Sequence, residues 1–567
     1  LEQALVIGIE GAGFIRAMPP ATAHEIVEQI QPGSPLDETM ARLVSRREGV
    51  SVILAGNIEQ DGSRYQLSVR ALDPGIEPGE GKPLATARAT AGSKDEVLAA
   101  VGKIAAELRG DLGDTTPKSD RQAATETFTA ASVEAMRAYA QGQELSAQGQ
   151  FEEALELYEE AVARDPEFGR AYAGMGVVYG NLRQEAKAEE SYQKALQHLD
   201  RMSERERYRT LGGYYFLVSQ NYVKAIENYE TLVELFPADS GGLTNLALAY
   251  LYVRDFDKAV DAGRQAVELE PNSVVNRMNY AMYAMYAGDF DTAIAESNTV
   301  FEQNTAFGYA LFTSARSAAA AGDADAARDD FAQLDGSEMM GASLAPIGRA
   351  DLALYLGRPR EAVTILQPAI ESSDNPFESA AMLVALGEAR LILGEVAGAV
   401  AAATQAADAS QHESVLYLAA RLMLATGEDE AAEEIAVQLD NRLQTQTSAL
   451  AGLIRGEAAL LDGRLADALE ALRRAWQDFD FWFAHYLMGR AYLEAGHFPE
   501  AIDELEHAER RKGEITDVFL VDSATLRYFP PALYWLGRAQ EGLGTSDAAR
   551  ERFAAYVDLR GDADPVD

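Results

Sequence analysis

The chain has 567 residues, and its 49 Lys and Arg stand against 90 Asp and Glu, so the formal net charge is −41. This acidity repels phosphate groups and argues against nucleic acid or an anionic membrane as a direct partner. No cysteine is present, which excludes disulfides and thiolate chemistry, and no apolar run approaches the ~20 residues of a membrane-spanning helix.

The first 113 residues predict a small α+β domain with the element order αβααβββα. Apolar and polar residues alternate along 65–71, as in a half-buried strand, and Asp61-Gly62 is a typical hairpin turn before it. The expected helices cover 2–9, 21–31, 36–47 and 94–112. The expected extended segments are 14–18, two strands within 50–72, and 83–90.

Three stretches of this domain are similar to the TolB-like/FlgO-like family: residues 1–19, 43–58 and 106–113. Residues 129–139 and 203–207 extend the resemblance, which covers residues 1 to about 310. In that family the domain precedes helical repeats and lies across one membrane helix from a cytoplasmic serine/threonine kinase, winged-helix DNA-binding domain or nucleotide cyclase. The family's first strand, membrane helix and effector have no counterpart here, so we expect a fragment cut inside the first helix.

Two segments predict irregular structure. Residues 114–128 are polar, contain Pro117 and lack apolar periodicity, which indicates a linker. Residues 561–567 are expected to be a frayed tail.

Residues 129–560 repeat one helical hairpin about twelve times. An alanine early in the second helix of each copy returns after 33–37 residues, with one longer separation of 48 (549 − 501). These residues are Ala154, Ala188, Ala225, Ala259, Ala293, Ala327, Ala362, Ala399, Ala432, Ala468, Ala501 and Ala549. The longer separation predicts an extended second helix and a loop over 510–531.

Two sets of glycines accompany the alanines. One set lies midway along the first helix, where a glycine costs about 0.5–1 kcal/mol relative to alanine and therefore indicates close packing. Its members are Gly142, Gly176, Gly213, Gly387, Gly456, Gly489 and Gly537. The other set lies in the turn, where glycine supplies a left-handed C-cap. Its members are Gly149, Gly288, Gly322, Gly357, Gly394, Gly427, Gly463, Gly496 and Gly544.

This pattern resembles the tetratricopeptide repeat family, whose period is about 34 residues. The resemblance implies a mainly α fold, in which a right-handed α-superhelix of about twelve hairpins follows the small α+β domain. Each hairpin buries its apolar faces only against its neighbours, so the array is quasi-one-dimensional.

No motif for catalysis is present. A phosphate-binding loop, a nucleophile elbow, the kinase signatures and a His-Glu-x-x-His zinc motif are all missing. His485, His497 and His507 share one repeat with Glu500, Glu504 and Glu506, which is the composition of a metal site. We expect these histidines not to converge, because they belong to the start of the first helix, the turn and the second helix. The sequence therefore predicts no catalytic residue, cofactor or metal.

Function is expected on the concave face, the surface that such repeats use to hold partners. First-helix positions two, five, nine and twelve face it. The predicted lining is Tyr214, Met278, Met282, Met285, Tyr309, Phe312 and Arg316. Methionines flanked by aromatic residues are typical of adaptable peptide grooves. Alternatively, drift in the register makes these methionines part of ordinary packing between repeats.

Two functions remain open. In the first, the chain is a non-catalytic scaffold or sensor segment of a bacterial transmembrane receptor, lies outside the cytoplasm and binds a protein or peptide. In the second, it is a free-standing soluble adaptor that organises a multiprotein assembly in the periplasm or the cytoplasm. Neither function involves nucleic acid, a cofactor or insertion of this chain into a membrane.

Overall fold

The computed structural model describes residues 1–18, 20–76, 81–115, 132–334, 341–442 and 444–565. Two compact units make up the chain, a first unit of residues 1–255 and a second unit of residues 256–567. Most of the predicted linker lies outside the described residues. Its first residue, Asp114, is buried and forms an ion pair with Arg109 (Oδ2 to Nη2, 2.7 Å).

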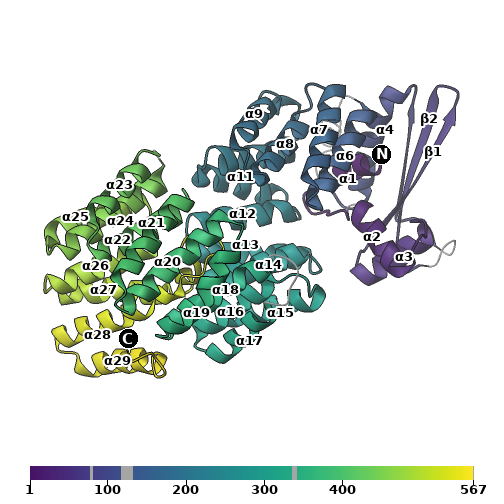
Figure 1. Cartoon of the computed structure of the whole chain (residues 1–567). Coiled ribbons are helices and arrows are strands. Elements are labelled where there is room, and N and C mark those ends of the chain that lie inside the picture. The colour runs from purple at the N-terminus through teal and green to yellow at the C-terminus, as the bar shows by residue number, and fades with distance from the viewer. Residues whose placement is uncertain (19, 77–80, 116–131, 335–340, 443, 566–567) are drawn as a thin grey trace. The chain divides into compact units, whose positions relative to one another are not determined.

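The first unit opens with the small α+β region that the alternating pattern predicted (Figure 1). Its elements are α1 (Glu2–Ile9), α2 (Pro20–Ile30), α3 (Glu38–Glu48), β1 (Ile53–Asp61), β2 (Arg64–Leu72), β3 (Ala85–Ala91), the short helix η1 (Lys94–Glu96) and α4 (Val97–Asp111). The three strands form one antiparallel sheet of order β1-β2-β3. Asp61 pairs with Arg64, and Gly62 between them has a φ of 61°, so the predicted hairpin turn is confirmed.

The predicted extended segment 14–18 is not a strand, so the expected element order is wrong at this point. The backbone in and just before this segment forms hydrogen bonds with other parts of the first unit instead of with a strand. The carbonyl of Gly13 accepts a hydrogen bond from the amide of Ala238 (3.1 Å), and Ala17 N donates to the carboxylate of Glu10 (3.2 Å). A side chain at Gly13 would lie 2.2 Å from the carbonyl oxygen of Leu235, so only glycine fits this contact.

The repeats of the first unit follow the sheet and share a hydrophobic core with it. Their helices are α6 (Val133–Ala147), α7 (Phe151–Arg164), α8 (Gly169–Asn181), α9 (Glu185–Leu196), α10 (Glu204–Gly213), α11 (Tyr222–Leu235) and α12 (Ser240–Tyr252). Two further short helices are η2 (Leu199–Arg201) and the π-helix η3 (Tyr214–Val218), which continues α10.

The second unit is built mainly of α-helices over the part that the structure describes. Its helices are α13 (Phe256–Leu269), α14 (Val274–Ala287), α15 (Phe290–Gln303), α16 (Tyr309–Ala321), α17 (Ala324–Leu334), α18 (Gly341–Tyr355), α19 (Pro359–Ser372), α20 (Pro376–Ile392), α21 (Val396–Ala409), α22 (Glu413–Thr426), α23 (Asp429–Asp440), α24 (Thr445–Leu461), α25 (Leu465–Asp478), α26 (Trp482–Glu494), α27 (Phe498–Arg510), α28 (Pro530–Leu543) and α29 (Ser546–Leu559). With the first unit they give the predicted succession of twelve helix pairs, so the mainly α fold is confirmed.

The small residues of the pattern lie where helices pack. All twelve repeat alanines are at most 3% exposed, and all nine turn glycines have positive φ. A Cβ at each of the seven helix glycines would lie within 3.0 Å of a side chain. That side chain belongs in most copies to the residue four positions after the repeat alanine, such as Tyr158 for Gly142 and Tyr192 for Gly176. In the third copy Gly212, rather than Gly213, has this role and meets Tyr229.

Gly176→Leu is expected to destabilise the first unit by about 1–3 kcal/mol, because its Cβ would lie 2.6 Å from the ring of Tyr192. Urea unfolding measures the loss, and hydrogen exchange should locate it in α8 and α9 while α26 to α29 keep their protection. The neighbouring exposed residue gives the control: Val177→Leu should change the stability by less than about 0.5 kcal/mol. Equal effects of the two substitutions would contradict this packing.

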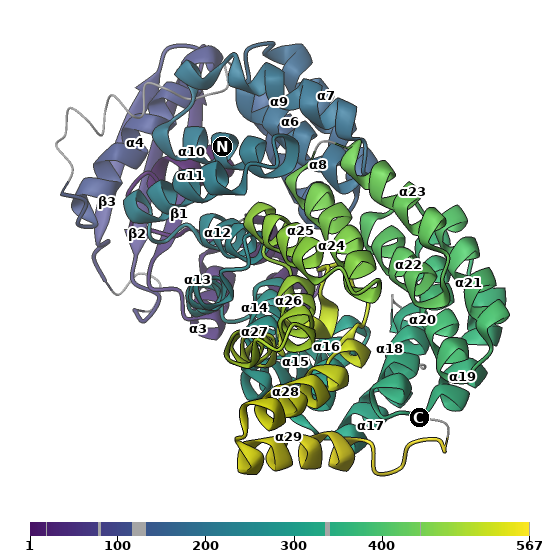
Figure 2. The same ribbon diagram turned by 90° about the vertical axis from the view of Figure 1, so that its left-hand side faces the viewer.

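Two expectations for the C-terminal part are wrong. The tail is not frayed over its described residues, because Asp564 N donates to the carbonyl of Gly357 (2.8 Å) and Arg360 N donates to the Asp564 carboxylate (2.9 Å). Figure 2 shows this tail running from α29 to the start of α19. The second helix before the long gap is not extended either, because α27 ends at Arg510 and residues 511–529 leave the helix.

Candidate functional site

Residues 511–529 form an irregular segment, called here the inner segment, that joins α27 to α28. It contains two short helices, η4 (Glu514–Asp517) and η5 (Leu526–Tyr528). The side chains of η4 are fully buried. Polar side chains of four first helices, α14, α16, α18 and α20, bond to it. The inner segment therefore covers the inner face of the helix pairs that begin with α14, α16, α18 and α20.

The first anchor of the inner segment is the buried carboxylate of Asp517. It accepts hydrogen bonds from Tyr286 Oη and Arg316 Nη1, both at 3.3 Å, and from the amides of Val521 (3.2 Å) and Asp522 (2.8 Å). Burial raises the pKa of the Asp517 carboxyl, and the Arg316 guanidinium opposes that shift. These bonds fix a turn in which Asp522 has a left-handed φ of 59°, a conformation that a non-glycine residue adopts at a cost.

The second anchor is Arg527, which lies between two acidic residues of α18 and α20. The carboxylate of Asp351, 3% exposed, accepts bonds from Arg527 Nη1 (2.9 Å), Arg527 N (3.2 Å) and Leu526 N (3.0 Å). Glu388 accepts from Arg527 Nε and from the hydroxyl of Tyr528. The Tyr528 ring in turn faces the Arg421 guanidinium of α22 at 5.2 Å. Every charged group of this anchor thus has a partner of opposite charge.

Lys512 is a partly buried cation at the start of the inner segment. Its ammonium lies over the rings of Phe529 (4.7 Å) and Tyr355 (5.9 Å). Burial lowers the pKa of Lys512 from 10.5 to about 8, while Glu509 acts in the opposite direction.

Lys512→Met should therefore change how stability depends on pH. Between pH 8 and 10.5 the unfolded chain binds a proton at Lys512 that the folded chain has lost, so this lysine makes the unfolding free energy rise with pH in that window. Parent and variant are compared by urea unfolding at pH 7.5 to 10. The unfolding free energy of the parent should rise relative to that of the variant as the pH rises. Parallel profiles would show that Lys512 is not buried as described.

Two of the predicted groove residues of the second unit, Tyr309 and Arg316, bond to the inner segment. Tyr309, half-buried, donates from its hydroxyl to Asp522, and the Arg316 guanidinium lies 4.1 Å from the ring centre of Phe312. Four of the seven predicted residues are at most 4% exposed: Met278, Met285, Phe312 and Arg316. Met282 and Tyr214 are half-buried, and Tyr214 belongs to the first unit. A partner would reach Arg316 only by displacing Asp517 of the inner segment, and the burial of two methionines agrees with the packing alternative.

The first unit presents apolar side chains on equivalent first-helix positions. Val177 of α8 and Leu217 of η3 are 38% and 36% exposed, and Tyr214 is half-buried. A Cβ at Gly180 would lie 3.7 Å from both methyl groups of Leu217, so the bare backbone of α8 lies beside that residue. These four residues, Val177, Gly180, Tyr214 and Leu217, are called the apolar inner surface. The sequence places Tyr214 and Leu217 on the concave face, and the predicted groove included Tyr214.

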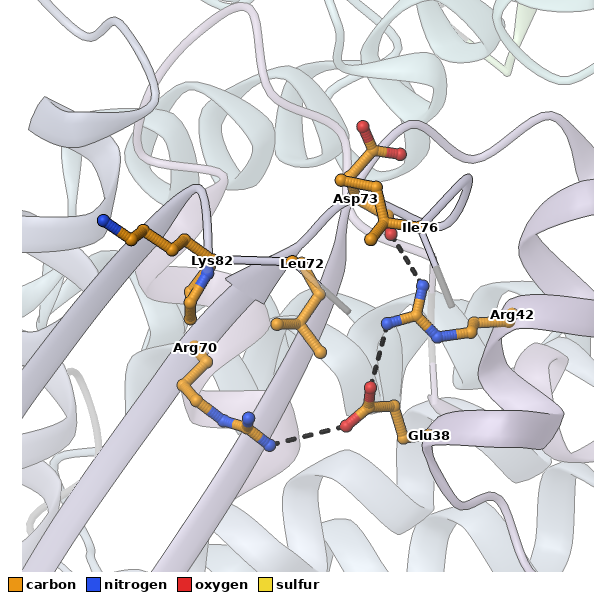
Figure 3. A pocket seen from close by; sticks show the side chains of 9 residues that line it. Glu38, Arg42, Arg70, Leu72, Asp73, Ile76 and Lys82 are labelled. Atoms are coloured by element: carbon orange, nitrogen blue, oxygen red, sulfur yellow. Dashed lines mark hydrogen bonds and ion pairs between the residues drawn. The ribbon is translucent and has the colours of Figure 1, made fainter. Parts of the chain in front are cut away.

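A small pocket lies between α3 and the sheet (Figure 3). Glu38 accepts a hydrogen bond from Arg42 Nη2 (2.9 Å) and another from Arg70 Nη2 (3.4 Å). Arg42 also donates from Nη1 to the carbonyl of Asp73 (2.7 Å). Glu38 thus pairs with both arginines, and the arrangement ties α3 to β2.

Two of the three candidate histidines come together, so the expectation that they diverge is wrong for His485 and His507. Their rings stack with centroids 3.9 Å apart. The reason is the antiparallel hairpin, which sets the start of α26 beside the end of α27. His485 donates or accepts at both nitrogens, Nδ1 with Glu504 (2.6 Å) and Nε2 with Asp480 (2.9 Å). His497 is in the turn and is 60% exposed.

The electrostatics of the two rings differ. Burial lowers the pKa of His485, but hydrogen bonds to Asp480 and Glu504 outweigh it and raise the pKa overall. Burial lowers the pKa of His507 to about 4, helped by the positive charges of His485 and Arg511.

Models of the tetratricopeptide repeat match the chain at residues 142–182, at 169–197, and at 210–274, 347–414 and 486–565. The chain is a tetratricopeptide repeat protein. The matches lie in the region where the twelve alanines recur, and the TolB-like resemblance of residues 1–113 remains a prediction. No helix among the described residues of this repeat protein is long and apolar enough to cross a membrane.

Several solved structures are similar to parts of this repeat protein. One is PilW, described as a widely conserved type IV pilus biogenesis factor, with 18% identity, a TM-score of 0.31, and coverage of 36% of this chain and 92% of PilW. Another is yeast Tom70, with 14% identity, a TM-score of 0.35, and coverage of 75% and 92%. A third is YrrB, described as having an unusual peptide-binding site, with 19% identity, a TM-score of 0.26, and coverage of 33% and 95%. Identities and TM-scores this low carry no information about function. No curated protein matches the sequence.

Proposed function

We propose that this tetratricopeptide repeat protein is a non-catalytic scaffold that binds a protein or peptide at the apolar inner surface of its first unit. Tetratricopeptide repeat proteins serve as scaffolds for protein interactions. The observation that supports this site is the contrast between the two units. Val177 and Leu217 expose apolar side chains at inner positions, whereas the inner segment covers the first helices of the second unit from α14 to α20.

The chemistry of the surface suggests the partner. Val177, Tyr214 and Leu217 offer an apolar contact of limited size, and the bare backbone at Gly180 leaves room beside Leu217. A short apolar segment fits such a contact. The net charge of −41 favours basic residues on either side of that segment, because long-range attraction steers association. Added salt should therefore slow association more than it speeds dissociation.

The test is a random peptide library displayed on phage and selected on the full chain. Selected peptides should be apolar with basic flanks, and the double variant Val177→Ser/Leu217→Ser should bind them at least tenfold more weakly. The matched control is Val557→Ser in α29, where the valine is 62% exposed and belongs to the second unit. Equal binding by parent and double variant, with the fold checked by circular dichroism, would refute this site.

We further propose that this scaffold is the extracytoplasmic part of a bacterial transmembrane receptor, which rests on the resemblance of residues 1–113 to TolB-like domains. A free-standing soluble adaptor in the periplasm or the cytoplasm is the second candidate, supported by the acidic, cysteine-free composition. The coding sequence upstream of Leu1 decides between them. A membrane helix with an effector domain there supports the receptor, and a signal peptide alone supports the adaptor.

A further inference from the structure

We propose that Asp480, His485 and His507 bind one zinc ion at the junction of α26 and α27. One ligand atom from each of these side chains lies within 4.8 Å of the others. Imidazole nitrogen and carboxylate oxygen are both zinc ligands, and three protein ligands leave the fourth tetrahedral position to water. One of these separations, from His485 Nε2 to an Asp480 carboxylate oxygen, is 2.9 Å, so side-chain rotations would place the three atoms around one ion.

The surroundings of His485 are those of a metal-ligating histidine. The residue is 5% exposed, and its Nδ1 bonds to Glu504 at 2.6 Å. A carboxylate on one ring nitrogen fixes the orientation of the ring and leaves the other nitrogen to the metal. That other nitrogen, Nε2, already faces Asp480 at 2.9 Å. Zinc would replace the proton that Nε2 and Asp480 share, and this proton would pass to solvent.

The hairpin holds the three ligands and leaves a path for the ion. His485 lies in the first turn of α26 and His507 in the last turn of α27, so regular helices set both backbones. Asp480 lies just before α26, and its side chain is 46% exposed, which gives an ion access from solvent. The ring of Trp476 meets His485 edge-on at 6.2 Å and covers another side of the site.

One cation competes for the same carboxylate. Arg511 Nη1 donates to Asp480 Oδ1 at 2.7 Å and also lies 3.5 Å from His507 Nε2, so the guanidinium must move away from both ligands when the ion binds. The guanidinium has other bonds, however, from Nε to Glu514 (2.8 Å) and from Nη2 to the carbonyl of Asp480 (2.9 Å). It can keep these bonds when the carboxylate turns to a metal. We therefore expect a site of moderate affinity, with a dissociation constant in the micromolar range.

Calorimetric titration of the full chain with zinc chloride after treatment with EDTA tests the site. The parent should bind one zinc ion, and His507→Ala should weaken this binding at least tenfold. The matched control, His497→Ala, replaces an exposed histidine of the same repeat and should bind like the parent. Cobalt(II) gives a second readout, because a tetrahedral nitrogen and oxygen site should show visible absorption in the parent but not in His507→Ala.

Asp480→Asn provides a variant whose folding is less at risk than that of a histidine variant, since Asp480 is half-exposed. It should also lose at least tenfold in zinc affinity while its circular dichroism matches that of the parent. Absence of zinc binding by the parent would overturn the proposal. So would binding that stays equal in His507→Ala and Asp480→Asn.

Discussion

Asp351→Ala is expected to lower the free energy of unfolding of the second unit by about 3–5 kcal/mol. The carboxylate is 3% exposed and pairs with Arg527, which is 7% exposed. Burial raises the pKa of the Asp351 carboxyl, and Arg527 opposes the shift. Removing the carboxylate leaves a buried cation with one acidic partner, Glu388, and leaves the amides of Leu526 and Arg527 without their acceptor. Uncompensated buried charge and orphaned donors are the costliest results of a single substitution.

Urea unfolding of the full chain measures this loss, and hydrogen exchange should show that residues 524–529 lose protection first. Asp325→Ala is the matched control, because Asp325 is 93% exposed and pairs with Arg328 of the same helix turn. Its effect should stay below about 0.5 kcal/mol. The amides of Leu526 and Arg527 bond to different oxygens of Asp351, so Asp351→Asn keeps an acceptor for one of them and should cost less than Asp351→Ala. A loss below 1 kcal/mol for Asp351→Ala would show that the second anchor does not hold the inner segment.

The helical repeat was predictable because its determinants are local in sequence. An alanine or glycine that packs against the next helix has its partner within about twenty residues, as Gly142 has Tyr158. The turn glycines were equally readable, since positive φ favours glycine. Turns without glycine were not: Arg183, Gln220 and Arg254 adopt φ values of 56°, 49° and 63° in the same position. There the packing of the two helices imposes a backbone conformation that the residue type does not favour.

The inner segment was not predictable, because its partners are distant in sequence. Asp351 precedes Arg527 by 176 residues, and Arg316 precedes Asp517 by 201. Helical periodicity carries no information about such pairs. The longer separation before Ala549 marked the place and predicted a loop there, but it also predicted an extended second helix, whereas α27 ends at Arg510. The burial of predicted groove residues was unpredictable for the same reason. Met285 and Arg316 lie at inner register positions, and no local pattern shows that the inner segment packs against them.

Gly513→Ala is expected to destabilise the second unit by about 3 kcal/mol, the upper end of the usual cost of overpacking. A Cβ at Gly513 would lie 2.4–2.5 Å from three backbone atoms at the end of α14, the carbonyl oxygens of Met285 and Tyr286 and the amide of Gly288. Backbone atoms of a packed helix cannot move aside as the end of a flexible side chain can. The inner segment must then shift away from α14, which strains the bonds of Asp517 to Tyr286.

The sign of the effect makes this test decisive. Gly513 has helical backbone angles, φ −59° and ψ −44°, where alanine is normally favoured over glycine by about 0.5–1 kcal/mol. Gly561→Ala is the control within the second unit, because the nearest atom to its added Cβ is 3.5 Å away, and its effect should be below about 0.5 kcal/mol. Urea unfolding and hydrogen exchange of residues 513–529 measure both variants. If Gly513→Ala instead stabilised the protein, the inner segment could not lie against α14, and the inner face of the second unit would be open to a partner.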